Sequence, residues 1–289
     1  MRTQETKGML LGLAGVVMFS LTLPFTRIAV AELSPYVVTF GRSALGGLCA
    51  LLVLWWTRPP WPTLRQWLRL MVMAVCVVYG FPLFVAIAMT TLPSAHGGIV
   101  LGVLPLVTAM VGAVRFKERP SRTFWLTAAL GSALVVMYAA LNGGGSLVYE
   151  DGLLFLAVLS AAIGYSEGGK LSEEMSSVDV ISWALVLTLP LNAWMTVHHW
   201  TVAIQSVSLA VWASFLYVGL VSMYVAFFFW YRGIALGGIA RVGQVQLLQP
   251  FFTLLGAYVL LSEPITLMNI GFALCVLAVV VLGKKTRAK

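Results

Sequence analysis

The chain has 289 residues, of which 60% are hydrophobic and 10% are charged. A composition this apolar excludes an ordinary soluble domain, so the protein is expected to act within a membrane. Its net charge of +8 at pH 7 does not indicate a nucleic-acid partner, because the basic residues lie in short loops between apolar segments.

Ten apolar segments follow one another along the chain. A helix that crosses the hydrocarbon core of a bilayer needs about 20 apolar residues, and each segment has roughly that length. The connecting loops leave little room for an extramembrane domain. We therefore predict an all-α membrane protein with ten transmembrane helices, at residues 8–30, 35–56, 67–90, 93–114, 122–141, 151–170, 178–198, 208–231, 238–261 and 265–283.

Loop charge predicts the orientation of these helices. Short loops rich in Arg and Lys stay on the cytoplasmic side, and 16 of the 18 basic residues lie at the termini or in alternate loops. The intervening loops at 91–95, 142–150, 199–207 and 262–264 contain no basic residue. Both termini of this multi-pass protein are thus expected to face the cytoplasm from the inner (plasma) membrane. The pattern is weakest at Lys170, where acidic residues outnumber the basic one.

The second half of the chain repeats the first. A shift of 145 positions aligns identical residues at five places: Ala95 with Ala240, Gly98 with Gly243, Pro105 with Pro250, Thr108 with Thr253 and Glu118 with Glu263. Because each half holds five helices, an odd number, the second copy must enter the membrane from the opposite face. Inverted repeats are typical of secondary transporters, whose substrate site lies near the midplane between the copies.

The repeat divides the chain into three parts. We assign 1–141 to the first five-helix repeat and 151–289 to the second, inverted one. The loop at 142–150 between them begins with Asn142-Gly-Gly-Gly-Ser146, a composition typical of a flexible hinge.

The repeated motif also resembles a known family. In each half, a helix rich in small residues carries a proline near its middle and a Glu-(x)-Pro at its end. Further similarities are Ser20-x-x-x-Pro24, Phe40-Gly41-Arg42 and the run Trp230-Tyr-Arg-Gly-Ile-Ala-Leu236. Over its whole length the chain resembles the drug/metabolite transporter superfamily and, within it, the EamA-like ten-helix exporters. It looks most like the aromatic amino-acid/paraquat exporters, which implies outward movement of amino acids, other small metabolites or xenobiotics.

Polar side chains in the ninth segment are the first candidates for a substrate site, since polar groups at hydrocarbon depth mark functional positions. At 100° per residue, Arg241, Gln244 and Gln249 fall on one side of a helix and Gln246 falls outside it. We expect Gln244 and Gln249 to line a wet cavity, with Arg241 nearer the cytoplasmic end. The alternative is ordinary hydrogen bonding between helices.

The fourth segment contributes His96, Gly98 and Gly102 to the candidate site. The two glycines let a ligand approach the backbone closely, but they equally allow a neighbouring helix to pack there. His96 titrates near neutral pH if it is exposed. Its alternative role is that of a hydrogen-bonded residue at the outer gate.

A proline and three tyrosines complete the candidate substrate site. Pro24 removes a backbone hydrogen bond and should kink or break the first helix, and Tyr165 lies in the corresponding sixth helix. Tyr79 and Tyr224, in the third and eighth segments, offer aromatic faces for a ligand side chain. Simple packing between helices is the alternative for each tyrosine.

Carboxylates inside the predicted helices are scarce, and this favours one mechanism. Glu167 alone lies within a helix body, and we expect it to form an i,i+3 pair with Lys170 near the cytoplasmic end. The first helix lacks the Glu with which small four-helix multidrug members exchange protons for cationic drugs. We therefore expect export of amino acids or similar metabolites by alternating access, with proton-coupled efflux of organic-cation drugs as the alternative.

Two local patterns resemble motifs of other kinds of protein, and we interpret both as coincidental. Gly164-x-Ser166-x-Gly168 matches the nucleophile-elbow motif of hydrolases. That motif needs a strand-to-helix turn, which a membrane-spanning helix does not offer, so we predict that the protein is not an enzyme. Ala29-Val-Ala31 resembles a signal-peptide cleavage site, whose use would delete the first helix. The three cysteines predict neither a disulfide nor a metal site, and no cofactor is expected.

The expected partners are a small-molecule substrate and the lipid bilayer, and the protein is expected to be a monomer. A channel or a membrane scaffold remains the alternative class.

Overall fold

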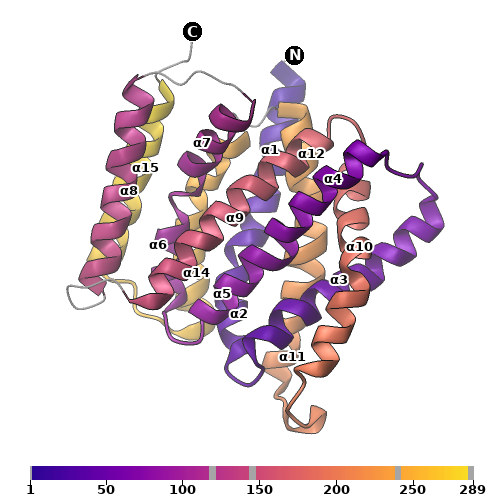
Figure 1. The fold of residues 1–289 in the computed structure, drawn as a ribbon. Coiled ribbons are helices and arrows are strands. Elements are labelled where there is room, and N and C mark those ends of the chain that lie inside the picture. The colour runs from indigo at the N-terminus through magenta and orange to yellow at the C-terminus, as the bar shows by residue number, and fades with distance from the viewer. Residues whose placement is uncertain (1, 117–121, 143–147, 238–241, 286–289) are drawn as a thin grey trace.

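The computed structural model describes residues 2–116, 122–142, 148–237 and 242–285, and every regular element within them is a helix. The helices lie side by side in one bundle (Figure 1). The start of the first helix and the end of the last lie at the same end of this bundle, which we call the terminal end. The opposite end is called the distal end.

The first half contains five membrane-spanning segments, three of which change helix type or break along their length. In chain order the elements are α1 (Arg2–Ser20) and α2 (Thr22–Val30); α3 (Pro35–Thr57); α4 (Leu64–Met73), the π-helix η1 (Ala74–Gly80) and α5 (Phe81–Ala88); α6 (Ser94–Leu101) and α7 (Leu104–Phe116); and α8 (Arg122–Asn142).

The second half has the same order of segments. Its elements are α9 (Tyr149–Leu171); α10 (Ser177–His198); a short 3₁₀ turn η2 (Ile204–Ser206); α11 (Leu209–Leu216), the π-helix η3 (Tyr217–Val225) and α12 (Ala226–Gly237); the 3₁₀ helix η4 (Gly243–Leu248) and α14 (Gln249–Leu261); and α15 (Leu267–Lys285).

Length and hydropathy of these helices agree with the predicted spans. Within the described residues, seven continuous helical stretches are long and apolar enough to cross a membrane, and three shorter apolar helices accompany them. Together they match the ten segments expected from the sequence. The predicted all-α, ten-helix membrane architecture is confirmed.

Elements of the two halves recur at the same spacing as the aligned residues. The bounds of α7 and α14 differ by 145 positions at both ends, and α8 and α15 start 145 positions apart. The π-helices η1 and η3 also occupy corresponding places in the third and eighth segments. A π-helix inside a longer helix is uncommon and frequently marks a functional site, so its presence in both halves directs attention to the helices around η1 and η3.

The first segment is interrupted near its middle, as its proline predicts. A turn at Leu21 separates α1 from α2, three residues before Pro24. Proline has no N–H to give to the carbonyl four residues earlier, which belongs to Ser20. That carbonyl instead accepts a hydrogen bond of 2.9 Å from the Thr253 hydroxyl of α14. At this break the first segment is therefore hydrogen-bonded to the ninth.

The two halves pack against each other along two long pairs of helices. Helix α3 packs against α10, and α1 packs against α12. The second pair approaches closely because both helices are rich in glycine: a Cβ added to Gly8 would lie 2.9 Å from the carbonyl oxygen of Gly233. Helices α8 and α15 form a separate pair at one edge of the bundle (Figure 1). The main hydrophobic core therefore lies among the helices of the first four segments of each half.

Candidate substrate-binding site

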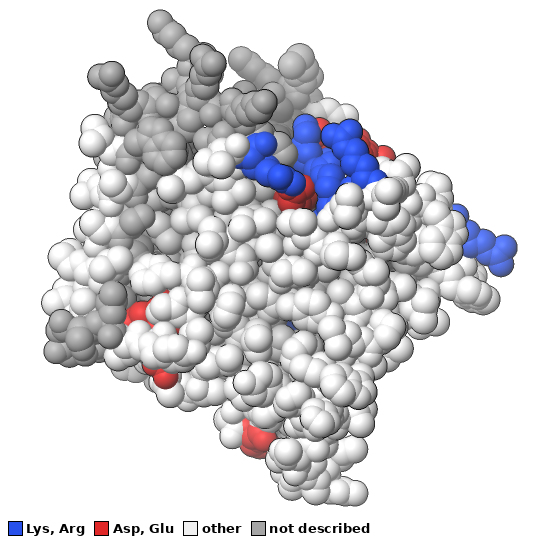
Figure 2. All heavy atoms as spheres, viewed as in Figure 1, with Lys and Arg blue, Asp and Glu red and all other residues white. Residues whose placement is uncertain are grey.

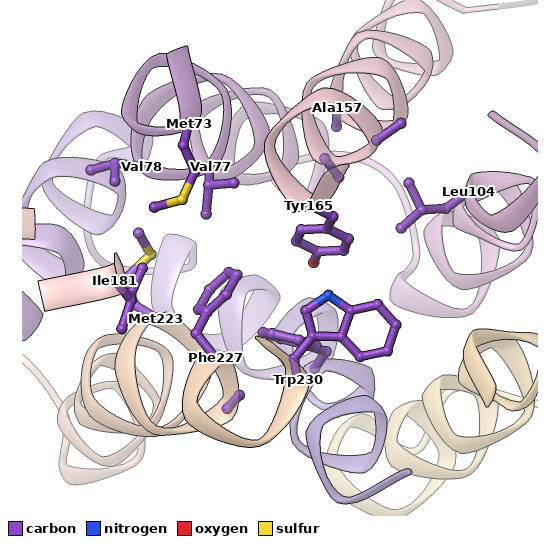
Figure 3. Close-up of a cluster of buried hydrophobic side chains, with 14 of the residues drawn as sticks. Met73, Val77, Val78, Leu104, Ala157, Tyr165, Ile181, Met223, Phe227 and Trp230 are labelled. Carbon is purple, nitrogen blue, oxygen red and sulfur yellow. The ribbon is translucent and has the colours of Figure 1, made fainter. Parts of the chain in front are cut away.

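Four aromatic side chains pack together in the core between the two halves. Phe19 comes from α1 in the first half, whereas Tyr165, Phe227 and Trp230 come from α9 and α12 in the second. The Tyr165 ring centroid lies 5.8 Å from that of Phe19 and 5.7 Å from that of Trp230, and Phe19 and Phe227 meet at 4.9 Å. In Figure 3 the Tyr165 hydroxyl and the Trp230 indole nitrogen point toward one another. We call these four residues the aromatic cluster.

A positive charge is buried beside this cluster. Arg42 of α3 is 3% exposed, and its Nη2 donates a hydrogen bond of 2.9 Å to the Ser222 hydroxyl of η3. The Ser222 hydroxyl in turn lies 2.7 Å from that of Thr22 in α2. The Nε of Arg42 has no hydrogen-bond partner, and no carboxylate of the described residues lies within 4.0 Å of the guanidinium. A buried cation without an ion-pair partner is costly within a membrane, so it marks a functional position.

Sequence reasoning did not place Arg42 among the site residues. Arg42 was identified only as part of the motif Phe40-Gly41-Arg42, which the chain shares with a transporter family. The signal that would have found it was an arginine seven residues inside a predicted span, far from either loop. The same principle that selected the glutamines of the ninth segment applies with more force to a charged side chain.

The tyrosines predicted for the site lie at three different places. Tyr165 belongs to the aromatic cluster. Tyr224 is buried, and its hydroxyl lies 2.8 Å from that of Ser182 in α10. Tyr79 of η1 is half-buried beside Phe40, with ring centroids 5.9 Å apart. Tyr165 and Tyr224 nevertheless belong to one hydrophobic core, and Tyr79 packs against the same core.

The glutamines of the ninth segment lie differently from the helical-wheel prediction. Residues 243–248 form a 3₁₀ helix, in which side chains three positions apart are eclipsed. Gln246 and Gln249 are both buried, and neither amide atom of Gln246 has a hydrogen-bond partner. The spacing of 100° per residue does not hold in a 3₁₀ helix, where Gln246 and Gln249, three positions apart, come near the same side. The side chain of Gln244, and Arg241 as a whole, lie outside what the structure describes.

Both glycines of the fourth segment pack against α14. A Cβ added to Gly98 would lie 2.6 Å from the Cγ2 of Thr253, and one added to Gly102 would lie 3.0 Å from the Cγ of Pro250. A third contact of this kind joins Gly256 of α14 to Pro24, whose Cγ would lie 3.4 Å from the added Cβ. These contacts correspond to the helix-packing alternative for Gly98 and Gly102.

His96 takes part in a buried pair at the distal end. Its Nε2 lies 2.7 Å from the Oδ1 of Asp151, the third residue of α9. The other carboxylate oxygen of Asp151 accepts a hydrogen bond from the Val148 N–H. His96 and Asp151 are 4% and 0% exposed. His96 is thus a hydrogen-bonded residue that joins α6 of the first half to α9 of the second.

Glu167 of α9 does not pair with Lys170, and that prediction was wrong. Its carboxylate is 2% exposed and accepts from the Nε of Arg69 at 3.0 Å and from the Nε of Arg115 at 2.7 Å. Lys170 instead bonds to Glu173 at 2.7 Å. The reason is that the Glu167 side chain faces α4 and α7, whereas Lys170 lies on the exposed side of the helix. We call Glu167, Arg69 and Arg115 the Glu167 network.

A second glutamate bridges the halves at the distal end. Glu263, which follows α14, accepts hydrogen bonds of 2.9 Å from the backbone N–H groups of Ser94 and Ala95 and from the Ser94 hydroxyl. Its Oε1 also lies 3.4 Å from the Nε of Arg27. A carboxylate at the start of a helix satisfies N–H groups that lack an intrahelical partner and complements the helix dipole. We call Glu263, Arg27, Ser94 and Ala95 the Glu263 network.

A cavity of about 380 Å³ opens next to the Glu263 network, at the distal end. Its polar lining includes Arg27, Glu32, Thr90 and Ser208. Glu32 accepts a hydrogen bond of 2.7 Å from the Ser208 N–H, and this bond lowers the pKa of the fully exposed Glu32 carboxyl below its ordinary value of 4.5. The central cavity predicted from the ninth segment stays a prediction.

A repeated ten-helix bundle with a buried cation at the contact between its halves defines a multi-pass membrane transporter. The chain matches the EamA-like transporter family twice, over residues 6–139 and 149–283. It is 42% identical over 279 residues to the uncharacterized transporter YdeK of Bacillus subtilis (strain 168), covering 95% of this chain and 97% of that protein. The protein therefore belongs to the EamA-like transporter family, within the drug/metabolite transporter superfamily.

Two further comparisons agree with this assignment. An uncharacterized transporter of Archaeoglobus fulgidus is 23% identical over 270 residues, which cover 91% of this chain and 94% of that protein. A chain in a crystal structure superimposes with a TM-score of 0.66 over 97% of this chain and 98% of its own length. At 19% identity, that structure shows the fold alone.

Proposed function

We propose that the protein is a secondary transporter that exports amino acids or similar small metabolites across the inner membrane by alternating access. The observation that carries this proposal is the aromatic cluster, to which both halves contribute and next to which polar side chains lack partners. Such a site suits a small solute with one apolar and one polar part. Movement of one half against the other would separate Phe19 from Tyr165 and expose the site to one side at a time.

Topology supports the outward direction that we assign. Five segments per half place the second repeat in inverted orientation, and the loop charges assign both termini to the cytoplasm. On the face shown in Figure 2, Lys and Arg gather mainly at the terminal end, and further acidic atoms lie at the distal end. In this assignment the cavity beside Arg27 opens to the outside and serves as the exit. The transporter works as a monomer, because each chain supplies both halves of the site.

The decisive experiment is counterflow in proteoliposomes of the purified protein. Vesicles are loaded with unlabelled aromatic, branched or small amino acids, or with cationic drugs, and uptake of a labelled tracer is followed without a pH gradient. Uptake that depends on the internal amino acid is the expected result, and it distinguishes a carrier from a channel. If amino acids fail and cations exchange only with an imposed proton gradient, the drug-antiporter function replaces the one proposed.

Substitutions in the ninth segment test where the solute binds. Gln244→Ala, Gln246→Ala and Gln249→Ala should each reduce counterflow without reducing the amount of protein in the membrane. Gln205→Ala provides the control, because Gln205 is exposed in the loop before α11. Normal counterflow in all three variants would remove the ninth segment from the site.

A further inference from the structure

Three hydrogen-bond donors around the aromatic cluster have no acceptor among the residues that the structure describes. The Nε of Arg42 and the Nε1 of Trp230 are buried without a partner, and the Tyr165 hydroxyl makes no hydrogen bond to any described residue. Arg42 bonds to Ser222, whose hydroxyl lies 2.7 Å from that of Thr22, three residues after Phe19 of the cluster. Tyr165 and Trp230 face one another (Figure 3). Since Arg and Trp can only donate, the group that would satisfy this site is an acceptor.

The depth of Arg42 makes the missing acceptor significant. Its hydrogen-bond partner Ser222 is the fourteenth residue of the 29-residue helical stretch Leu209–Gly237, close to its middle. At that depth neither water nor lipid headgroups reach the guanidinium readily, and an unmatched charge is expensive. The Ser222 hydroxyl, which is itself hydrogen-bonded to Thr22, supplies a neutral oxygen atom to the guanidinium. It leaves the charge of Arg42 uncompensated.

Three other described arginines near the ends of the bundle form ion pairs with carboxylates. Arg69 and Arg115 bond to Glu167, and Arg27 pairs with Glu263. Arg42 differs from these three in that no carboxylate of the described residues pairs with it, while its Nε is buried without a hydrogen-bond partner. An ionised acceptor forms a shorter and stronger hydrogen bond with guanidinium than a neutral one does. The single charge of Arg42 matches a monoanion such as a carboxylate better than a phosphate dianion.

We propose that Arg42 binds the carboxylate of the transported solute, with the Tyr165 hydroxyl and the Trp230 indole N–H as further donors. The rings of Phe19 and Phe227 then contact the apolar part of the solute. This inference rests on the proposed function and deepens it, because it restricts the substrate to solutes that carry a carboxylate. It also assigns the carboxylate to the first half of the protein and the additional donors to the second half.

The test compares solutes that differ only in the carboxylate. Counterflow is measured with phenylalanine, with phenylalaninamide, in which an amide replaces the carboxylate, and with phenethylamine, which lacks it. The wild-type protein should exchange phenylalanine about tenfold faster or more than either analogue, the difference expected for one charge-assisted hydrogen bond. Arg42→Gln should lose that preference, and Arg42→Lys should retain part of it, since ammonium keeps the charge without the planar fork. Arg65→Gln, at an exposed position of α4, is the matched control.

A milder variant keeps the test decisive if Arg42→Gln does not fold. Tyr165→Phe removes a hydroxyl that has no hydrogen bond to a described residue, so the fold should tolerate it. It should raise the phenylalanine concentration needed for half-maximal exchange by several-fold and leave that of phenylalaninamide unchanged. If Arg42→Lys and Tyr165→Phe both keep the wild-type preference for the carboxylate, the inference is wrong while amino-acid export stands. If the wild-type protein exchanges no carboxylate solute at all, the proposed function itself fails.

Discussion

The two ends of the bundle are each bridged by a glutamate of the second half, but the partners of the two glutamates differ. The Glu167 network at the terminal end consists of side-chain ion pairs, and its carboxylate is 2% exposed. The Glu263 network at the distal end uses two backbone N–H groups and a hydroxyl at the start of α6, with Arg27 3.4 Å away. One network depends on two opposite charges, and the other mainly on the geometry of a helix end.

This difference bears on the transport cycle, because both networks join the two halves. A buried carboxylate that loses its arginines is left with an uncompensated charge. A carboxylate that leaves a helix start can exchange those hydrogen bonds for water at smaller cost. In the proposed cycle, the Glu263 network at the distal end should therefore open more readily than the Glu167 network. Selective removal of each network tests this order.

Removing the buried carboxylate should have the largest effect. Glu167→Gln leaves Arg69 and Arg115 without their shared partner, although Arg69 keeps Glu174 and Arg115 is already exposed to solvent. We expect a loss of about 3 kcal/mol in stability, the lower limit for a broken buried pair. Thermal unfolding in detergent measures the stability, and counterflow should fall in parallel because the terminal end no longer closes.

The neighbouring pair on the same helix end provides the control for Glu167. Glu173→Gln removes the exposed Lys170–Glu173 pair, for which less than about 0.5 kcal/mol is expected. Equal destabilisation by the two substitutions would contradict the assignment of Glu167 as the residue that holds this end together.

Neutralising the distal glutamate should have an intermediate effect. Glu263→Gln keeps an oxygen that can accept from Ser94 or Ala95 but loses the charge that faces Arg27, so about 1 kcal/mol is expected. The distal end should open more often. A cysteine introduced at Ala31, which lines the cavity, should then react faster with a membrane-impermeant maleimide. Unchanged labelling together with normal stability would show that the Glu263 network does not control access.

Substitution of Glu32, the exposed glutamate at the same end, should have the smallest effect on stability. That effect should depend on pH. The Ser208 N–H lowers the pKa of Glu32, so the ionised form favours the folded state. That contribution is fully present above the ordinary value of 4.5 and is lost as the pH falls through the lower pKa of the folded protein. The difference in Tm between wild type and Glu32→Gln should therefore shrink as the pH decreases from 6 to 3. A constant difference would mean that the bond does not form in solution.

Sequence reasoning predicted features that depend on neighbours along the chain. Bilayer thickness fixes how many apolar residues a span needs, so the ten segments follow from hydropathy with errors of only a few residues at their ends. Proline chemistry predicted the interruption of the first helix at Pro24. The same reasoning did not predict the 3₁₀ helix at Gly243–Leu248, because nothing local distinguishes a 3₁₀ turn from an α-helical one in that segment.

The sequence by itself therefore determined the membrane architecture, the repeat and the family of this protein. The tertiary structure decided the partners of its charged residues: Glu167 meets Arg69 across 98 positions of the chain, and Arg42 meets Ser222 across 180. The physical reason is that hydropathy and helix periodicity are local, whereas an ion pair depends on depth in the bundle and on which helix faces which. The position of a buried arginine, with no carboxylate partner among the described residues, beside an aromatic cluster emerges from that packing alone.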